Sequence, residues 1–390
     1  MARRTLKKRP RKRVALLIET SNAYGRGLLR GIRSFVRENS QWSTFLIESG
    51  RGQASPEWVT RFKGDGIIAR IETPDIAAAV TATGLPVVDV SAARLIESLP
   101  WVETDDRAIA ELAMNHLTER GFKRLAYCGD DRFNWSRWRG DHFTKLTQQA
   151  GHKCAVLNTP AEALDPDREL AVLTEWLQSL EKPVGIMACY DIRGRQILDA
   201  CRAADIAVPD DVAVLGVDND QLLCDLTDPT LSSIVPDTHK AGYLAASTLA
   251  KLMARRRVAP GSGQLVEPRG VVTRRSTDGL AIEDAEVSAA MRFIREHACE
   301  GINVEDVLAQ VPLSRRVLEA RFKRAINRSP HQQIVRLQLQ RAKQLLAETR
   351  LPLSQIAAAC GFRHAEYLSV VFKKYEGVPP SHYRSAHGVS

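Results

Sequence analysis

The stretch Val208-Pro-Asp-Asp-Val-Ala-Val-Leu-Gly-Val-Asp-Asn219 decides the fold of most of this 390-residue chain. Its central run, Val212–Val217, is apolar and rich in valine, which is typical of a β-strand. Asp218 and Asn219 follow directly. Ligands of open α/β sheets bind at the carboxyl ends of the strands. The stretch therefore predicts a strand that ends at a binding site.

Short runs of the same kind alternate with helical periods on the N-terminal side of this stretch. A first series begins at Val14–Ile18, and a second begins near Trp101. Repeated strand–helix alternation implies parallel sheets with right-handed crossovers. Residues 14–277 are therefore predicted to form an α/β domain of two lobes with a crevice between them.

Three further motifs accompany the opening stretch: Asp228-Pro-x-Leu-Ser-Ser-Ile-Val, Gly242-x-x-Ala-Ala and Val271-x-x-Arg-Arg-Ser-Thr277. Together they closely resemble the ligand-binding core of the LacI/GalR repressors, and the last motif resembles its final strand. The resemblance implies a type-I periplasmic-binding-protein fold that binds a sugar. We expect the usual N-terminal DNA-binding helices of that family to be absent, because the first strand is predicted to start near Val14.

Polar and aromatic side chains that suit a sugar follow the predicted strands. Planar polar groups grip adjacent hydroxyls, and aromatic faces stack on C–H patches. The resemblance implies that Arg139 contacts the inducer and that Asp218 binds sugar hydroxyls. Alternatively, Asp191 could cap a helix, Arg139 could form a surface ion pair, Asp218 could serve only its turn, and Trp135 could belong to the core or a dimer interface. The ligand-binding residues we expect are Ser21, Asn22, Tyr24, Trp135, Arg139, Asp191, Arg193, Asp218 and Asn219.

The C-terminal region contains an internal repeat of helices. Val307 and Val311 match Ile356 and Cys360 at an offset of 49. Each copy has a short helix, a tight turn and a second helix, which is the helix-turn-helix pattern. A long helix that starts at Pro330 separates the copies. We expect a linker at 278–286 and an all-α domain at 287–390 with two helix-turn-helix motifs.

The second copy carries Ile356-Ala-x-x-Cys-Gly-Phe, then Tyr367-Leu-x-x-x-Phe-Lys-Lys-Tyr-x-Gly-x-Pro-Pro-x-x-Tyr-Arg384. These motifs closely resemble the AraC/XylS family of DNA-binding domains. Arginine recognises guanine and glutamate can accept from cytosine, whereas lysine more often contacts phosphate. Alternatively, the charges are only the solvated faces of a helical bundle. By matching positions, the DNA-binding residues would be Arg315, Arg316, Glu319, Lys323, Arg363, His364, Glu366, Ser369 and Lys373.

The charge distribution agrees with a nucleic-acid partner at the ends of the chain. The formal net charge is +9. Residues 1–13 hold eight basic residues and no acid, and residues 285–390 hold 16 basic and nine acidic residues. The middle is net acidic. We expect residues 1–13 to be a disordered basic tail. The tail could be a solubilising start, a phosphate-binding arm, or the product of a mis-assigned start codon.

Several classes of protein are disfavoured. No apolar run approaches 18 residues, so we expect no membrane partner. The seven scattered cysteines contain no CxxC, and the histidines contain no HExxH, which favours a reducing cytoplasm and no metal. The glycines of Gly25–Gly31 have the spacing GxGxxxG, one residue too long for a dinucleotide fingerprint. We therefore expect no cofactor and no enzyme.

A sugar-binding core fused to an AraC-type domain resembles the xylose operon regulators. We expect a sugar-responsive transcription regulator, an activator of a pentose (xylose-like) operon, that binds double-stranded operator DNA as a homodimer. RNA polymerase is a further candidate partner. The alternatives are a repressor of the same architecture that responds to another sugar, an NAD-dependent enzyme, and a binding protein whose helical domain docks another protein.

Overall fold

The computed structural model describes residues 11–39, 42–47, 57–159, 165–279, 281, 284–326 and 328–387. The chain divides into two compact units, Met1–Gly279 and Leu280–Ser390. Each unit is described by itself below. No helix in the described ranges is long and apolar enough to cross a membrane.

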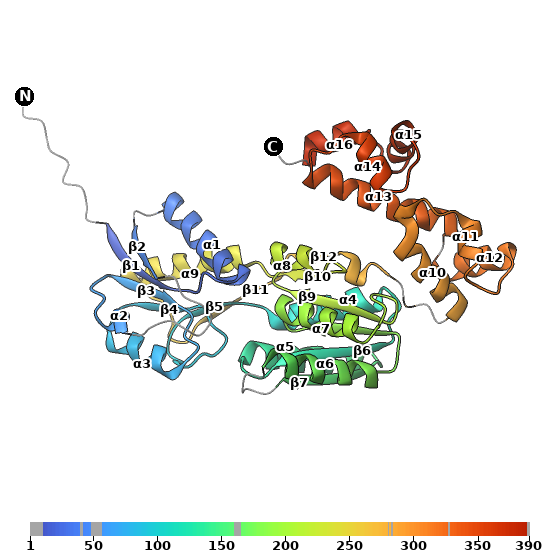
Figure 1. The fold of residues 1–390 in the computed structure, drawn as a ribbon. Helices are drawn as coiled ribbons and strands as arrows, with labels where there is room; N and C mark the ends of the chain where they lie inside the picture. Colours follow the sequence, from blue (N-terminus) through green and yellow to red (C-terminus); the bar gives the residue numbers. More distant parts are fainter. Residues whose placement is uncertain are drawn as a thin grey trace, which may run out of the picture. The chain divides into compact units, whose positions relative to one another are not determined.

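The N-terminal unit contains two six-stranded sheets, one in each of two lobes (Figure 1). Every strand pair of the lobe 1 sheet is parallel, and its order is β11-β5-β4-β3-β1-β2. The strands of this sheet are β1 Lys12–Leu17, β2 Trp42–Leu46, β3 Gly66–Ala69, β4 Val87–Asp89, β5 Trp101–Thr104 and β11 Gly263–Val266.

The lobe 2 sheet has the order β12-β10-β9-β8-β6-β7, and only its edge strand β12 runs antiparallel to its neighbour. β9 is the strand predicted at Val212–Val217, and all of its residues are buried. The strands are β6 Arg124–Asp130, β7 Lys153–Thr159, β8 Val184–Ala188, β9 Val212–Val217, β10 Ser232–Val235 and β12 Gly270–Val272.

Helices cover the faces of both sheets, as parallel strands require. The chain passes between the lobes after β5, after β10 and after β11, so each lobe is built from separate segments. Lobe 1 has helices α1 Ala23–Asn39, α2 Glu57–Thr60, α3 Pro74–Ala82 and α9 Thr238–Met253. Lobe 2 has α4 Asp106–Thr118, α5 Asn134–Gln149, α6 Pro166–Ser179, α7 Asp191–Ala203, α8 Gln221–Leu226 and the 3₁₀ turn η1 Arg275–Thr277.

The glycines of Gly25–Gly31 serve helix packing. A Cβ on Gly31 would lie 1.9 Å from the backbone oxygen of His239, and a Cβ on Gly27 would lie 1.9 Å from the Thr238 hydroxyl oxygen. Both partners belong to α9, so these glycines allow α1 and α9 to approach closely.

The C-terminal unit is all-α, with helices α10 Ala285–His297, α11 Val304–Leu308, α12 Arg315–Ile326, α13 Pro330–Glu348, α14 Leu353–Ala359, α15 Ala365–Glu376 and α16 Pro380–His387, and the 3₁₀ turn η2 Ala298–Glu300. Ser329 caps α13 in a reciprocal capping box with Gln332. α13 gives Ile334 to a core with α10–α12, and it gives Leu339 and Leu346 to a separate core with α14 and α15.

Three boundaries differ from expectation. β1 begins at Lys12, not Val14, because Lys12 and Arg13 pair with Trp42 and Ser43 of β2. The segment Arg275–Thr277 is a 3₁₀ turn and not part of the last strand. α10 begins at Ala285, inside the linker expected at 278–286. Of the predicted tail, residues 1–10 lie outside the described residues.

Candidate ligand pocket and nucleic-acid interface

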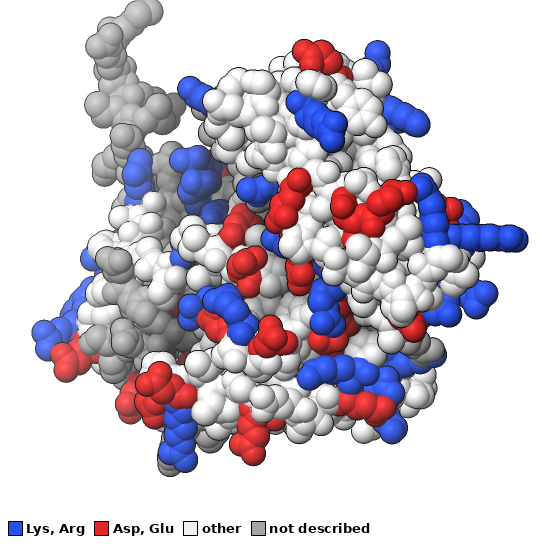
Figure 2. Space-filling view, turned by 45° about the vertical axis from the view of Figure 1, so that its right-hand side comes forward, with Lys and Arg blue, Asp and Glu red and all other residues white. Residues whose placement is uncertain are grey.

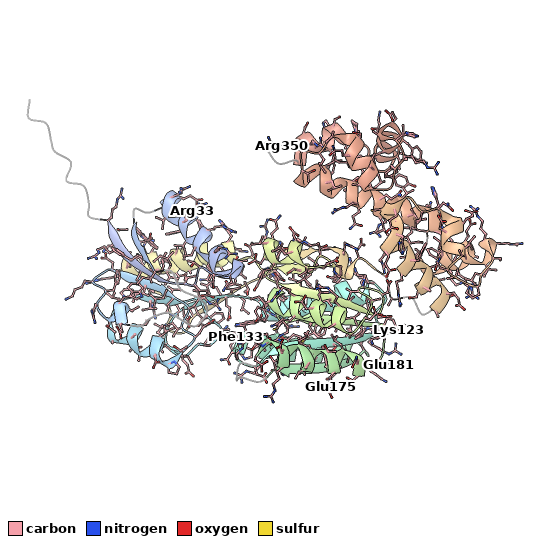
Figure 3. The ribbon with its side chains drawn as sticks, viewed as in Figure 1. Arg33, Lys123, Phe133, Glu175, Glu181 and Arg350 are labelled. Atoms are coloured by element: carbon pink, nitrogen blue, oxygen red, sulfur yellow. The ribbon has the colours of Figure 1, made fainter. Side chains whose placement is uncertain are left out.

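The strand ends of both lobes meet around one pocket. Figure 3 labels Phe133 at the end of lobe 2 that faces lobe 1, whereas Lys123 and Glu181 lie at the opposite end of that lobe. The carboxyl ends of the lobe 2 strands thus point to the pocket, as parallel α/β sheets predict. The lining residues are Tyr24, Arg70, Val90, Glu103, Thr104, Asp106, Trp135, Arg139 and Asp218.

Arg70 follows β3 directly and is buried. Its two terminal nitrogens donate to the carboxylates of Glu19 and Glu72. Its Nε is buried and has no partner in the described part of the chain. A buried donor without a partner costs free energy unless a ligand or water accepts from it. Arg70 is therefore held in place by two acids at the wall of the pocket, and its buried Nε–H has no partner in the described part of the chain.

Arg139 of α5 and Asp106 of α4 form a buried ion pair. Nε and Nη2 of Arg139 donate to Oδ1 of Asp106 at 2.9 and 2.6 Å, and Nη1 donates to the backbone oxygen of Cys189. The arginine is therefore oriented before any ligand arrives. Beside this pair, burial and then the Asp106 charge raise the pKa of Glu103 to about 7, although Arg94 donates to it at 3.0 Å.

Two aromatic side chains line the pocket. The Tyr24 hydroxyl lies 3.3 Å from the Thr104 hydroxyl, and burial raises its pKa well above the ordinary value. The Trp135 ring stacks on Phe133 with centroids 5.1 Å apart, and the Arg139 guanidinium carbon lies 5.1 Å from the Trp135 centroid. A fixed indole face beside ionic groups can pack against C–H bonds while polar neighbours bind hydroxyls.

Asp218 and Asn219 form a strained loop after β9. Their φ angles are +107° and +47°, in a region that residues other than glycine seldom adopt. Asp191 stabilises this loop, because its carboxylate accepts from the backbone N–H of Asp220 at 2.7 Å and from the Ser233 hydroxyl at 2.6 Å. Burial, with the Asp218 charge adding to it, raises the pKa of Asp191 well above its ordinary value. Such strain persists only where the surroundings hold it, and it often marks a functional site.

The structure brings four of the nine expected ligand residues to the pocket: Tyr24, Trp135, Arg139 and Asp218. The other five do not line it. Ser21 is exposed, the Asn22 side chain bonds to Glu19 and Gly25, Asp191 supports the loop, Asn219 accepts from Arg274, and Arg193 is buried in ionic contact with Glu169.

Arg70, Glu103, Thr104 and Asp106 line the pocket but were missed. Arg70 follows the run Gly66–Ala69, and Glu103 and Thr104 lie at the end of the strand predicted near Trp101. The rule that ligands meet strand ends would have found them if applied to these two strands as well.

The two helix-turn-helix motifs repeat in their burial as well as in their sequence. Val307 and Ile356 are fully buried in the first helices, and Phe322 and Phe372 in the second. The second helices, α12 and α15, carry the expected DNA-binding side chains except Arg363 and His364, which lie directly before α15. Most of these are exposed, namely Arg315, Arg316, Glu319, Lys323, Arg363, His364, Glu366 and Lys373.

Some of the expected residues, among them Arg315, Glu319 and Ser369, have partners within the protein. Arg315 donates to Glu319 at 3.1 Å and to Glu305 at 2.7 Å, all exposed, so solvent screens these pairs. Ser369 is half-buried and donates to the backbone oxygen of Ala365. Some exposed side chains on the same helices are apolar, namely Val317, Tyr367 and Val370. They were not predicted, because the prediction considered only charged and polar side chains.

The two motifs are joined by a tight junction. A Cβ on Gly361, whose φ is +77°, would lie 2.6 Å from the backbone nitrogen of Gly301, so only glycine fits there. From α13, the buried Gln338 side chain donates to the backbone oxygen of Ala298 at 2.9 Å. Figure 2 shows that basic and acidic side chains are interspersed over the molecular face that it draws.

A two-lobed ligand-binding unit followed by paired helix-turn-helix motifs defines a ligand-responsive DNA-binding transcription regulator. Residues 13–106 match the XylR N-terminal domain, 114–277 the periplasmic binding protein-like domain, and 307–386 a helix-turn-helix domain. The Xylose operon regulatory protein of Escherichia coli K12 is 34% identical over 97% of this chain and 98% of its own. The protein of that name from Haemophilus influenzae is 32% identical over 95% and 98%. The chain belongs to the family of xylose operon regulatory proteins and is not an enzyme.

The solved structures agree. A structure described as the xylose-binding transcription activator xylR superposes with a TM-score of 0.81 at 33% identity, over 97% of this chain and 99% of that one. The complex of the transcriptional regulator CelR with cellobiose has a TM-score of 0.57 at 20% identity over 68% of this chain and 85% of that one. This second likeness supports only the fold of the N-terminal unit.

Proposed function

We propose that the pocket binds a pentose of the D-xylose type and that the bound sugar increases operator binding by the C-terminal unit. The observation that carries this proposal is the lining of the pocket. Ionic groups that are already oriented, Arg70, Arg139 and Asp218, surround a fixed indole face. Paired hydroxyls match guanidinium and carboxylate groups, and C–H patches match aromatic faces.

Each lining residue has a role in this proposal. Arg70 offers its partnerless Nε to a sugar oxygen. Asp218, Arg139 and Trp135 belong to lobe 2, across the pocket from Arg70 of lobe 1. Asp218 accepts from adjacent hydroxyls, Arg139 donates, and Trp135 packs on the ring. Glu103, with a pKa of about 7, can act as acceptor or donor near neutral pH. Because the lining comes from both lobes, a sugar would hold them together.

The regulator is proposed to be a cytoplasmic homodimer that activates transcription through RNA polymerase. Support comes from the relatives, one of which is described as a transcription activator. Repression by the same architecture is the alternative, since the position of the operator relative to the promoter decides the sign of regulation. A sugar-dependent reporter assay distinguishes activation from repression.

The test is calorimetry of the full chain with D-xylose, L-arabinose, D-ribose and D-glucose. We expect D-xylose to bind most tightly. The Asp218→Ala variant should lose about 10- to 100-fold in affinity, because hydrogen bonds to a charged group contribute about 1.5–3 kcal/mol. The matched control is Asp199→Ala on α7, whose carboxylate meets Arg195 and Arg202 at the surface. Absence of binding by every sugar, or equal losses in both variants, would overturn the proposal.

A further inference from the structure

The end of lobe 1 that lies away from lobe 2 collects the connections that lead into its strands. Because every strand pair of this sheet is parallel, the segments that precede the strands all lie at the same edge. Figure 1 places the start of β1 at the end of lobe 1 remote from lobe 2. The turn between α9 and β11 reaches the same edge, since a Cβ on Gly66 at the start of β3 would lie 3.1 Å from the sulfur of Met253.

These connections are basic. Arg255, Arg256 and Arg257 are consecutive and exposed between α9 and β11. Others lie before β1, at the end of α1 and before β3. Figure 3 labels Arg33, a turn before Arg37, on α1. We call this surface the basic end of lobe 1 and define it by the exposed residues Arg11, Arg37, Arg61, Lys63, Arg255, Arg256 and Arg257.

Two acidic side chains nearby, Asp65 and Glu38, have partners of their own, whereas the exposed Glu57 and Asp75 line a surface hollow together with Arg61. Asp65 accepts from Lys12 Nζ at 2.7 Å and from the backbone N–H of Arg13 at 2.8 Å, which lowers its pKa. Glu38 accepts from the Tyr243 hydroxyl at 3.0 Å. Within the described part of the chain, no side chain that defines the basic end forms an ion pair. The positive charge of this surface is therefore not neutralised by direct ion pairs.

The form of the surface favours an extended polyanion over a small one. Its members stand on separate connections and are exposed, so they do not converge on a buried site. Arginines on separate connections can each contact a different phosphate of an extended backbone, without reading its sequence. Residues 14–279, which hold all of these cations except Arg11, are net acidic by sequence, so the cations are concentrated locally.

We propose that the basic end of lobe 1 binds the phosphate backbone of double-stranded DNA, as a second contact besides the helix-turn-helix unit. This contact adds affinity that is independent of sequence and weakens with salt. It rests on the charges of lobe 1 alone and not on the identity of the sugar. Failure of sugar binding would therefore leave it untouched.

The test uses the full chain and a 60-base-pair duplex without an operator, with binding measured by fluorescence anisotropy between about 50 and 200 mM KCl. The variant replaces Arg255, Arg256 and Arg257 by glutamine. The matched control replaces three exposed cations of lobe 2 by glutamine, namely Lys145, Lys153 and Arg168, which changes the net charge equally. A second variant, Arg61→Gln with Lys63→Gln, probes the same surface from another connection.

We expect the slope of log affinity against log salt to become shallower by about 0.9 for each phosphate contact that is lost. Both basic-end variants should show this change, the control should keep the wild-type slope, and all should keep the wild-type melting temperature. Wild-type slopes in both basic-end variants would overturn the proposal. So would an equal change in the control, which would assign the effect to net charge. Binding to phosphatidylglycerol vesicles with unchanged DNA slopes would assign the surface to lipid and overturn it too.

Discussion

At the scale of single residues, the buried His116 makes the stability of the protein depend on pH. Its Nε2 lies 2.8 Å from the Thr277 hydroxyl oxygen, and burial, with the Arg120 charge adding to it, lowers the pKa to about 3. A depressed pKa gives stability that is complete above the unfolded value of about 6.5 and is lost as the pH falls toward 3. The free energy of unfolding of the wild type should therefore fall by about 2 kcal/mol between pH 6.5 and pH 5 because of this group alone.

His116→Gln should cost about 1–3 kcal/mol at pH 7, because the Thr277 contact is disturbed. The difference in free energy of unfolding between the variant and the wild type should become smaller as the pH falls. The wild type loses stability through His116, whereas glutamine does not titrate. Urea unfolding followed by tryptophan fluorescence at pH 7, 6 and 5 measures this difference. A difference that stays constant over this range would mean that His116 is not the titrating group.

The position of a functional residue could be predicted where secondary structure places it, but not where contacts between side chains do. Asp218 follows a strand, and strand ends are readable from sequence, so its place at the pocket was expected. Arg193 also follows a strand, but its side chain turns to Glu169 and Thr159 within lobe 2. Which of two polar partners a buried arginine selects depends on tertiary packing, and the sequence alone contains no signal for it.

At the scale of elements, η1 and its neighbour Arg274 hold the strained loop beside the pocket. Arg274 donates to Asn219 Oδ1 at 2.9 Å and to Asp225 at 2.8 Å, whereas the adjacent Arg275 meets only the exposed Asp228. Arg274→Ala should weaken sugar binding about 5- to 10-fold although Arg274 does not line the pocket, since each lost hydrogen bond costs about 0.5–1.5 kcal/mol. Calorimetry compares it with Arg275→Ala, which should bind as the wild type does. Equal sugar affinities of the Arg274→Ala and Arg275→Ala variants would show that the loop keeps its conformation without Arg274.

The recognition helix α15 offers two kinds of contact that can be separated. Val370 is 65% exposed at its middle, and an exposed apolar side chain suits a thymine methyl group, whereas Lys373 suits a phosphate. Val370→Ala should lower operator affinity and relax the preference for one base pair without changing the salt slope. Lys373→Gln should make that slope shallower by about 0.9 and leave base preference intact. Anisotropy with an operator and its point mutants tests both, and identical behaviour of the two variants would contradict the assignment.

The elements themselves were largely predictable, because strand–helix alternation and the 49-residue repeat are properties of local sequence. The exception, Arg275–Thr277, is informative. Its sequence suggested a continuing strand, but Ser276 is fully buried and bonds to Val214 and Ser232 across the end of lobe 2. Side-chain contacts to distant strands decided the backbone there, and local propensity could not reveal them.

At the scale of the whole molecule, one unit gathers sugar-binding chemistry and the other gathers DNA-reading helices, so regulation requires free energy to pass between them. If bound sugar raises operator affinity by some factor, operator DNA must raise sugar affinity by the same factor. Couplings of this kind typically amount to about 1–3 kcal/mol, or roughly 5- to 150-fold.

Two titrations of the full chain measure this factor independently. Anisotropy gives operator affinity with and without saturating D-xylose, and calorimetry gives D-xylose affinity with and without saturating operator. The two ratios should agree. Asp218→Ala should need about 10- to 100-fold more D-xylose for the same rise in operator affinity. It should keep the operator affinity of the sugar-free wild type, because Asp218 lies in the pocket and not in the C-terminal unit. If sugar affinity is the same with and without operator, the pocket does not control DNA binding, and the sugar must act on a step after the operator is bound.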